Sequence, residues 1–308
     1  MGMKFLYRRL KSNIADLQAA FLYFSYKHLL KNPLSRSRFL ADVPNLTEVQ
    51  KRIVGDLNAR GVAFAHFQEL FSDRAYWERL SQDAADFSSQ VMNQGGVVEK
   101  KKDTPKDYKE FLIKKYSWNA QFSKENLWLR LGLDPRILAI VNSYLQLYAK
   151  LNMVDLWHTL PQPDTAMREY SQNWHRDPDD DKMLKIFLYF SDVSERNGAM
   201  EYVPDSSSSG PYFDFQRLPV GFRSNYFPSV DLEKCLKNMD KVSCFGPPGT
   251  MVFCDTRGFH RGGFSTEESR LLANFVYVTP ASLSPRRFLL DGDPSQWDIS
   301  AVAKRALG

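Results

Sequence analysis

Apolar residues recur at helical spacing in the first part of the chain and in strand-like runs in the second part. Six apolar residues near the start are separated by three or four positions, which places them on one face of a helix. They are Leu6, Leu10, Ile14, Leu17, Phe21 and Phe24. Pro33 is expected to limit this helix, because proline has no backbone N–H to donate. Residues 47 to 50 predict the start of a second helix that ends near Gly61, followed by a short strand at 62 to 65 and a mainly helical stretch from 66 to about 150.

The second half of the chain has the texture of a β protein. Runs of β-branched and aromatic residues are bounded by Pro, Gly, Asp and Ser, which is typical of strands. These runs are residues 153 to 157, 185 to 190, 251 to 254 and 272 to 278. They predict a mainly β fold with flanking helices and a jelly-roll core over about residues 150 to 282. Residues 205 to 240 are expected to form one long excursion over the mouth of the barrel.

Length and charge suggest a simple domain organisation. A chain of 308 residues that is 43% hydrophobic can bury a large core, as one sizeable domain or two small ones. We interpret residues 41 to 308 as one domain and residues 1 to 40 as a basic, amphipathic helical extension. The first 40 residues hold eight Lys and Arg against Asp16 alone, a net charge of +7. Because the whole chain carries +5, the remainder is slightly acidic at −2.

Cysteine usage and hydropathy favour a cytoplasmic location. Cys235, Cys244 and Cys254 are odd in number and form no Cys-x-x-Cys pair, which argues against a disulfide framework and against a thiolate zinc site. No apolar run approaches the roughly 18 to 20 residues that span a bilayer, and no secretory cleavage signal is recognisable at the start.

Four residues combine into a candidate metal and cosubstrate site. On an extended strand, His175 and Asp177 project to the same face, so an imidazole and a carboxylate can meet one ion. Ferrous iron in oxygenases is typically held by two histidines and one carboxylate, which leaves positions for a cosubstrate and dioxygen. His260 is the best candidate for the second histidine. Arg270, at the head of the next strand, is suited to pair bidentately with the distal carboxylate of a dicarboxylate.

Each of these residues also has a structural alternative. A His-x-Asp pattern is common by chance, and it can be a strand-end histidine bonded to a solvated acid. His260 alone could be a loop histidine, and Arg270 could form a surface ion pair. The combination of all four at these positions is what favours a metal site.

With these residues in place, the chain resembles the phytanoyl-CoA dioxygenase-like family of Fe(II)- and 2-oxoglutarate-dependent oxygenases over about residues 47 to 282. The landmarks of the resemblance are Arg60-Gly61-Val62, Trp174-His175-Arg176-Asp177, residues 192 to 204, His260 and Arg270. The resemblance implies a double-stranded β-helix, cupin-like in form, with the N-terminal helical region packed outside it.

The chain departs from the family pattern at two places. Relatives often continue after Pro204 with glycine, serine and histidine, whereas this chain has Asp205-Ser206-Ser207. Relatives also often have a serine two positions after the distal histidine, where this chain has Gly262, so one hydroxyl that would help to hold 2-oxoglutarate is missing. Halogenases similar to this family lack the metal-binding carboxylate, so Asp177 disfavours halogenation.

The function that the resemblance implies is oxidation, most simply hydroxylation, of a C–H bond in a small-molecule or acyl substrate. The expected cofactor is Fe(II), and 2-oxoglutarate and O2 are the expected cosubstrates, with succinate and CO2 as products. The alternative, from a different class, is a non-catalytic β-helix domain that binds a ligand or a partner and keeps its metal residues as relics. The sequence does not identify the substrate.

Other conspicuous residues have weaker interpretations. His158 could point into the barrel near the substrate or be a buried structural histidine. His28 and His66 are predicted to pack. Residues 179 to 181, three aspartates in a row, lack the glycine and distal glutamate of a calcium loop and are predicted to form a solvated turn.

The basic, aromatic start of the chain has two possible partners. Its apolar face could lie in the interface of an anionic membrane, or it could pack on the catalytic domain or on another protomer, which the sequence favours. A nucleic-acid partner is not expected, because the basic cluster is short and the rest of the chain is acidic.

Overall fold

The computed structural model describes residues 22, 24–93, 111–116, 119–163, 166–207, 210 and 236–308. Residues 6 to 21 of the first predicted helix, most of the predicted excursion at 205 to 240, and Cys235 lie outside the described residues. The helical elements are η1 (Tyr26–Lys31), α2 (Asn32–Leu40), α3 (Glu48–Arg60), α4 (Phe67–Leu70), α5 (Arg74–Asn93), α6 (Leu127–Gly132), α7 (Pro135–Leu145), η2 (Tyr170–Gln172), η4 (Pro294–Gln296) and α9 (Ala301–Ala306). The strands are β1 (Val62–His66), β2 (Leu112–Lys114), β3 (Gln121–Phe122), β4 (Lys150–Thr159), β5 (Met183–Tyr189), β6 (Glu201–Tyr202), β7 (Val242–Ser243), β8 (Thr250–Cys254), β9 (His260–Arg261), β10 (Arg270–Val278) and β11 (Leu289–Leu290).

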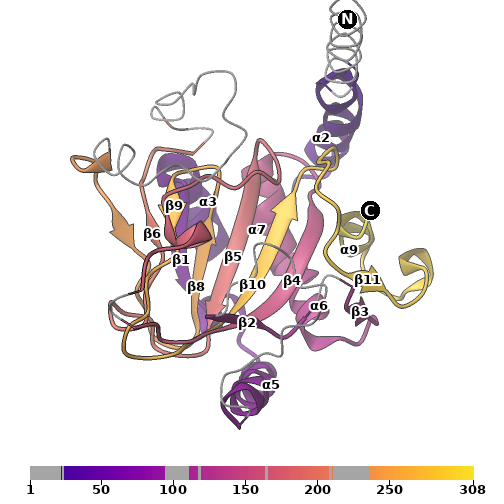
Figure 1. Cartoon of the computed structure of the whole chain (residues 1–308). Coiled ribbons are helices and arrows are strands. Elements are labelled where there is room, and N and C mark those ends of the chain that lie inside the picture. Colours follow the sequence, from indigo (N-terminus) through magenta and orange to yellow (C-terminus); the bar gives the residue numbers. More distant parts are fainter. Residues whose placement is uncertain are drawn as a thin grey trace, which may run out of the picture.

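A mostly antiparallel sheet with helices forms the body of the molecule (Figure 1). Six strands are hydrogen-bonded in the order β1-β8-β5-β10-β4-β2, and every neighbouring pair in this sheet is antiparallel. A second sheet has the order β7-β6-β9, and β11 pairs in parallel with β3. Neighbours in the large sheet come from distant parts of the sequence, which brings the two halves of the chain together.

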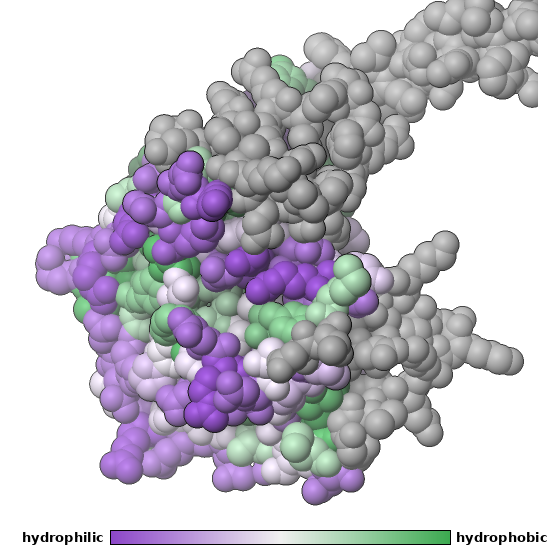
Figure 2. All heavy atoms as spheres, turned by 60° about the vertical axis from the view of Figure 1, so that its left-hand side comes forward, coloured by the Kyte–Doolittle hydropathy of each residue, from purple (hydrophilic) through white to green (hydrophobic). Residues whose placement is uncertain are grey.

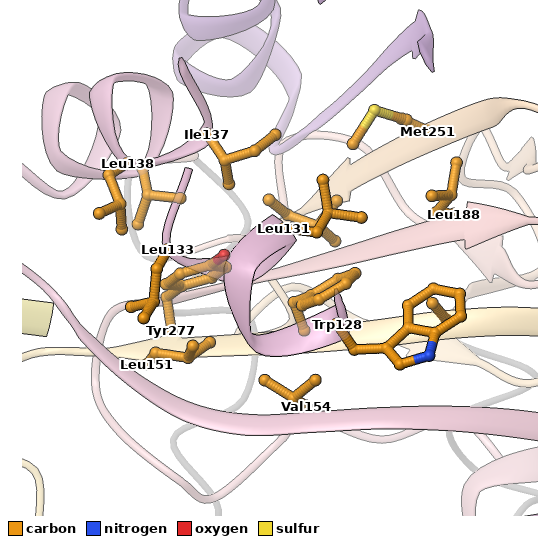
Figure 3. Packing of buried hydrophobic residues seen from close by; sticks show 14 of the residues in the cluster. Trp128, Leu131, Leu133, Ile137, Leu138, Leu151, Val154, Leu188, Met251 and Tyr277 are labelled. Atoms are coloured by element: carbon orange, nitrogen blue, oxygen red, sulfur yellow. The ribbon is translucent and has the colours of Figure 1, made fainter. Parts of the chain in front are cut away.

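One face of the large sheet is covered by helices. Side chains from α6 and α7 interdigitate with side chains from β4, β5, β8 and β10 in a single apolar cluster (Figure 3). Trp128 and Leu131 on α6 and Leu138 on α7 are almost completely buried there. Burial of residues of this size, each contributing about 1.5 to 3 kcal/mol relative to exposure, makes this layer the main source of stability.

The opposite face of the large sheet is covered by the small sheet. Tyr202 on β6 packs into a second apolar cluster with Phe187, Tyr189, Val252 and Leu272, which lie on strands of the large sheet. The molecule thus has three layers, which are helices, the six-stranded sheet and the three-stranded sheet. The two candidate histidines belong to the side of the small sheet, because His175 forms an isolated β-bridge with His260 on β9.

The helix predicted to end near Gly61 and the predicted strands are confirmed. Helix α3 starts with a capping box, in which the Thr47 side chain accepts from Gln50 N and the Gln50 side chain accepts from Thr47 N. It ends at Gly61, whose φ of 77° is a left-handed conformation that glycine adopts without strain. The four predicted β runs are strands β4, β5, β8 and β10. Cys244 and Cys254 are buried free thiols.

The prediction for Pro33 is wrong. The chain stays helical through it, with the six-residue π-helix η1 leading into α2, and Pro33 lies in the first turn of α2. Pro33 donates no backbone hydrogen bond, and the helix changes from π to α just before it, so the hydrogen-bond pattern is irregular at this point. The prediction that His28 packs is also wrong, because His28 is exposed, whereas His66 is half-buried at the start of α4.

The predicted solvated turn at residues 179 to 181 is instead a centre of buried contacts. Asp180 accepts hydrogen bonds from the backbone N and the hydroxyl of Thr279, at 2.7 and 2.6 Å, and pairs with Lys27. Asp179 pairs with Arg287. Only Asp181 has an exposed side chain. The local sequence looks like a surface turn, but the partners that bury it come from both ends of the chain.

Candidate metal centre

The structure brings His175, Asp177 and His260 together. Each can offer one ligand atom, and these three atoms lie within 4.8 Å of one another. Nε2 of His260 is 3.5 Å from Asp177 Oδ2, and Nε2 of His175 is 3.8 Å from Asp177 Oδ1. All three residues are buried. The spacing and the donor set, two imidazoles and one carboxylate, fit a divalent metal ion of the first transition row.

Backbone contacts set the positions of both histidines. His175 lies in an extended segment after η2, not in a regular strand as predicted, and it exchanges two backbone hydrogen bonds of 3.0 and 3.1 Å with His260. Nδ1 of His175 lies 2.8 Å from Asn173 O, and Nδ1 of His260 lies 3.0 Å from Gly258 O. A carbonyl can only accept, so each Nδ1 donates and each Nε2 is left with a lone pair directed at the shared position.

The charge states of the three residues suit metal binding. Burial lowers the pKa of His175 to about 3, and burial also lowers the pKa of His260, so both imidazoles are neutral near pH 7. Burial opposes the charge of Asp177, but the neighbouring Lys185 ammonium outweighs it and holds the pKa of that carboxyl well below its usual value. Neutral imidazole and ionised carboxylate are the protonation states that coordinate metals.

Lys185 on β5 is a feature of the site that the sequence did not reveal. Its ammonium nitrogen lies 2.7 Å from Asp177 Oδ2. At this distance the Lys185 ammonium and the Asp177 carboxylate form a buried ion pair. Because Lys185 belongs to β5, this ion pair shows which face of the large sheet the three candidate ligands lie on.

The loop between β8 and β9 holds the backbone of Asp177. Asp177 N donates to Thr256 O at 2.9 Å, and Arg257 Nη1 donates to Asp177 O at 2.7 Å. Asp255, buried at the start of this loop, accepts from the Tyr144 hydroxyl at 2.6 Å and from Arg257 N at 3.0 Å. A helix-layer residue, Tyr144, thus helps to fix the loop that supports the site.

Gly258 is required where it stands. A Cβ at this position would lie 2.1 Å from the hydroxyl oxygen of Tyr202, which is buried and donates to Asp255 O. Any side chain would therefore displace Tyr202 or the loop. Because Gly258 O accepts from His260 Nδ1, such a shift would also turn the imidazole.

Arg270 points to the same face of the large sheet as Lys185. Lys185 lies directly opposite Val276 on β10, and Arg270 is an even number of residues from Val276 on the same strand, so the three side chains share one face. Nε of Arg270 is buried without a hydrogen-bond partner among the described residues, and burial lowers the pKa of its guanidinium. Arg270 as a whole is half-buried, and an anionic ligand would give its Nε a partner.

Asn274 is a second orphaned group on this face. It lies on β10 between Arg270 and Val276, fully buried, and within the described ranges neither its amide oxygen nor its amide nitrogen has a partner. Directly across on β4 is Asp155, whose carboxylate accepts from Tyr116 N, Leu156 N and Trp157 Nε1. Arg270 Nε and the two amide atoms of Asn274 are thus unpartnered polar atoms on one face of β10 among the described residues.

His158 lies on the other face. It pairs across β10 with Leu271, which belongs to the apolar cluster under the helices. Burial lowers the pKa of His158, so the ring is neutral. Of the two interpretations of this histidine, the structure supports the buried structural one.

The backbone of Ser171 lies close to Gly262, at the position of the missing serine. Gly262 N donates to Ser171 O at 2.6 Å, and a Cβ on Gly262 would lie 3.2 Å from the same oxygen. A side chain at position 262 would therefore require Ser171 to shift by a few tenths of an ångström.

A cavity of about 490 Å³ adjoins the loop that carries Asp177. It is lined by Pro178, the residue after Asp177, by Arg257, by residues 179 to 181, by Leu283 and Ser284, and by Lys27 from the N-terminal helical segment. The N-terminal segment therefore forms part of a wall next to the candidate metal centre.

The fold is similar to that of several solved structures, two of which were solved with iron. The epimerase SnoN, solved with Fe3+, alpha-ketoglutarate and nogalamycin RO, matches with a TM-score of 0.52 at 16% identity over 75% of this chain and 84% of SnoN. EctD from S. alaskensis with bound Fe matches with a TM-score of 0.51 at 15% identity over 80% of this chain and 82% of EctD. AviO1 from Streptomyces viridochromogenes Tue57 matches with a TM-score of 0.50 at 16% identity over 77% of this chain and 98% of AviO1. At these identities the likeness shows the fold.

No known family model and no curated protein sequence matches the chain. The resemblance to the phytanoyl-CoA dioxygenase-like family therefore stays a prediction. None of the described helices is long and apolar enough to cross a membrane.

Proposed function

We propose that this chain is a non-haem Fe(II)- and 2-oxoglutarate-dependent dioxygenase with a double-stranded β-helix (jelly-roll) core of the phytanoyl-CoA dioxygenase-like type. The observation that carries the proposal is the convergence of His175, Asp177 and His260 within 4.8 Å in their metal-binding protonation states. The fold likeness to SnoN and EctD, which were solved with iron, supports it.

The residues have distinct roles in this proposal. His175, Asp177 and His260 would hold Fe(II) on one side, with each imidazole fixed through its Nδ1 contact. The Arg270 guanidinium would pair with the distal carboxylate of 2-oxoglutarate, which would give its orphaned Nε a partner. Asn274, between Arg270 and the level of Lys185, offers a neutral hydrogen bond to the bound cosubstrate.

The proposed reaction is the oxidation, most simply hydroxylation, of a C–H bond in a small-molecule or acyl substrate. Bound iron would supply the activation of dioxygen, coupled to the conversion of 2-oxoglutarate into succinate and CO2. The protein holds the reacting groups in place and excludes water, because all three candidate ligands are at most 7% exposed.

Anaerobic titration with Fe(II) and 2-oxoglutarate tests the proposal. The wild-type protein is expected to develop the weak visible charge-transfer band of an iron–2-oxoglutarate chelate, and to release succinate when O2 is admitted. His260→Ala is expected to do neither. His28→Ala is the matched control, because His28 is exposed and outside the site, and it is expected to behave as wild type.

Two results would overturn the proposal. One is a wild-type protein that gives neither the band nor succinate, which would favour the non-catalytic ligand-binding module. The other is a His260→Ala variant that retains both, which would place any iron chemistry elsewhere.

A further inference from the structure

The helical segment from Leu22 to Leu40 turns its polar side toward the body of the protein. Lys27, Ser35 and Phe39 are buried, and because they are separated by multiples of four residues they lie on one face. Two of these three contacts are polar. Ser35 exchanges hydrogen bonds with the backbone of Tyr148 at 3.0 and 3.1 Å, and the Lys27 ammonium pairs with Asp180 and Asp181.

The same segment exposes its apolar side chains. Leu22, Tyr26, Leu30 and Leu34 recur every fourth residue, with Leu29 beside them, and we call these five residues the apolar stripe. All five are exposed, Leu29 at 74% and Leu30 at 60%. In the usual arrangement a helix of a globular protein buries its apolar face and exposes its polar face, so this helix is inverted.

The inversion is fixed by the docking contacts. Burial opposes the charge of Lys27, but its hydrogen bonds with Asp180 and Asp181 raise the pKa of Lys27 above its usual value, so the ion pair is intact. The Asn32 side chain donates to the Thr279 hydroxyl and accepts from Ala281 N, both at 3.1 Å. Rotating the helix to bury the apolar stripe would break all of these contacts, leaving buried groups unpaired. The stripe is therefore held outward.

Charge on the segment selects the kind of partner. No acidic residue occurs between positions 22 and 41, and Lys31, Arg36 and Arg38 are exposed on the same helical segment. In Figure 1 the described part of this segment projects from the body. On the face of the body shown in Figure 2, apolar residues lie between hydrophilic ones, as is normal for a protein surface. In the N-terminal segment, by contrast, the apolar stripe is continuous and the charged residues are all basic.

We propose that the segment from Leu22 to Leu40 is an interfacial helix that binds the surface of an anionic membrane. The apolar stripe would enter the boundary between headgroups and acyl chains, while Lys31, Arg36 and Arg38 would contact the anionic headgroups. Lys27 lines the cavity beside the Asp177 loop, so membrane binding would place that cavity close to the bilayer surface. This inference does not depend on the proposed function.

Vesicle flotation with the full-length protein tests the inference. The wild type is expected to float with phosphatidylcholine vesicles that contain about 30% phosphatidylserine, and to float much less with phosphatidylcholine alone or at high salt. Leu29→Glu/Leu30→Glu is expected to reduce the bound fraction at least tenfold, and Lys31→Gln/Arg38→Gln is expected to reduce it several-fold with anionic vesicles only. Met92→Glu/Met167→Glu adds the same charge at exposed apolar residues elsewhere and is the control.

Thermal unfolding and light scattering complete the test. All four leucine and methionine positions are exposed, so these variants are expected to unfold at the wild-type temperature. The inference is overturned if the wild type does not float, or if Leu29→Glu/Leu30→Glu and the control float equally. It is also overturned if the wild type is a dimer in solution that Leu29→Glu/Leu30→Glu dissociates without any vesicle binding, because the stripe would then cover a second copy of the chain.

Discussion

Two groups of buried polar residues, one at each end of β10, are satisfied in opposite ways. The Asp180 carboxylate is satisfied within the chain, by the Lys27 ammonium from the N-terminal segment and by the backbone N–H and hydroxyl of Thr279 after β10. On the sheet face that carries Lys185, in contrast, Arg270 Nε and both amide atoms of Asn274 have no partner among the residues that the structure describes.

Polar groups that are paired within the chain stabilise the fold, whereas buried polar groups without a partner are suited to bind a ligand. A satisfied buried ion pair that loses one partner leaves an uncompensated charge, so it resists change. An orphaned buried group already carries its desolvation cost in the folded protein, and it recovers that cost only when a ligand binds. Substitution in the first group should therefore affect stability, and substitution in the second group should affect binding.

Asp180→Ala is expected to have the largest effect on stability. It leaves Lys27 buried with Asp181 as its one acidic partner and removes two hydrogen bonds to Thr279, so the free energy of unfolding should fall by about 3 to 5 kcal/mol. Urea denaturation measures it. Asp181→Ala is the control and should cost about 1 kcal/mol or less, because the Asp181 side chain is 71% exposed. Equal losses in the two variants would contradict this view of the Asp180 cluster.

Arg270→Leu is expected to weaken ligand binding and to leave the stability of the protein without ligand unchanged. Loss of a charge-assisted pair, worth about 1.5 to 3 kcal/mol, should weaken 2-oxoglutarate binding by about 10- to 100-fold. Stability without ligand should not fall, because Nε of Arg270 has no partner to lose within the described chain. Titration of the charge-transfer band gives the affinity, and thermal unfolding gives the stability. An unchanged affinity, or a large loss of stability, would place Arg270 among the fold-holding groups.

Asp155→Asn tests a group between the two extremes, because Asp155 is hydrogen-bonded yet buried opposite Asn274. Burial raises the pKa of Asp155 to about 6 from its usual 3.8. Because the folded protein holds this proton more tightly than the unfolded chain, the contribution of Asp155 to the free energy of unfolding is fully present below pH 3.8 and is lost as the pH rises through 6. Between pH 5 and pH 8 the expected loss is about 1.4 kcal/mol.

The measurement is the difference between wild type and Asp155→Asn in urea unfolding at pH 5 and at pH 8. Taking the difference removes the opposite contribution of the buried histidines, whose lowered pKa values make folding less favourable as the pH falls below about 6.5. A wild-type-minus-variant difference that does not change with pH would show that Asp155 titrates normally.

Asn274→Leu should have the smallest effect. Leucine has a similar shape and no polar atoms, so the protein without ligand should be unchanged or more stable by about 1 kcal/mol. Binding of 2-oxoglutarate should weaken by about fivefold, the value of one neutral hydrogen bond. Thermal unfolding with and without the cosubstrate measures both. A variant that is much less stable without ligand would show that Asn274 has a partner within the fold.

Sequence patterns predicted the parts of the structure whose causes are local. Helix α3 follows from its capping box and terminal Gly61, and the long strands follow from runs of β-branched residues. His175, Asp177, His260 and Arg270 could be selected because their chemistry is specific and their spacing relative to strands is informative. The structure brings the three candidate ligands together as expected.

The features that the sequence did not predict depend on contacts between distant segments. The strands of the small sheet are two residues long and carry no periodicity. The register of β10 with β5, which no local pattern encodes, is what places Lys185 and Asn274 on the site-facing side. The local sequence around Asp180 is typical of a surface turn, and its burial depends on Lys27, which lies 153 positions earlier in the chain.

Calorimetric titration of Fe(II) into the protein under anaerobic conditions tests the central claim most directly, because it measures the metal site without requiring the substrate. The wild type should bind one Fe(II) per chain, and His175→Ala, Asp177→Ala and His260→Ala should each lower the affinity at least 100-fold while Asp298→Ala, at an exposed acid, leaves it unchanged. A wild type that binds no Fe(II), or triad variants that bind it as tightly as the wild type, would contradict the claim.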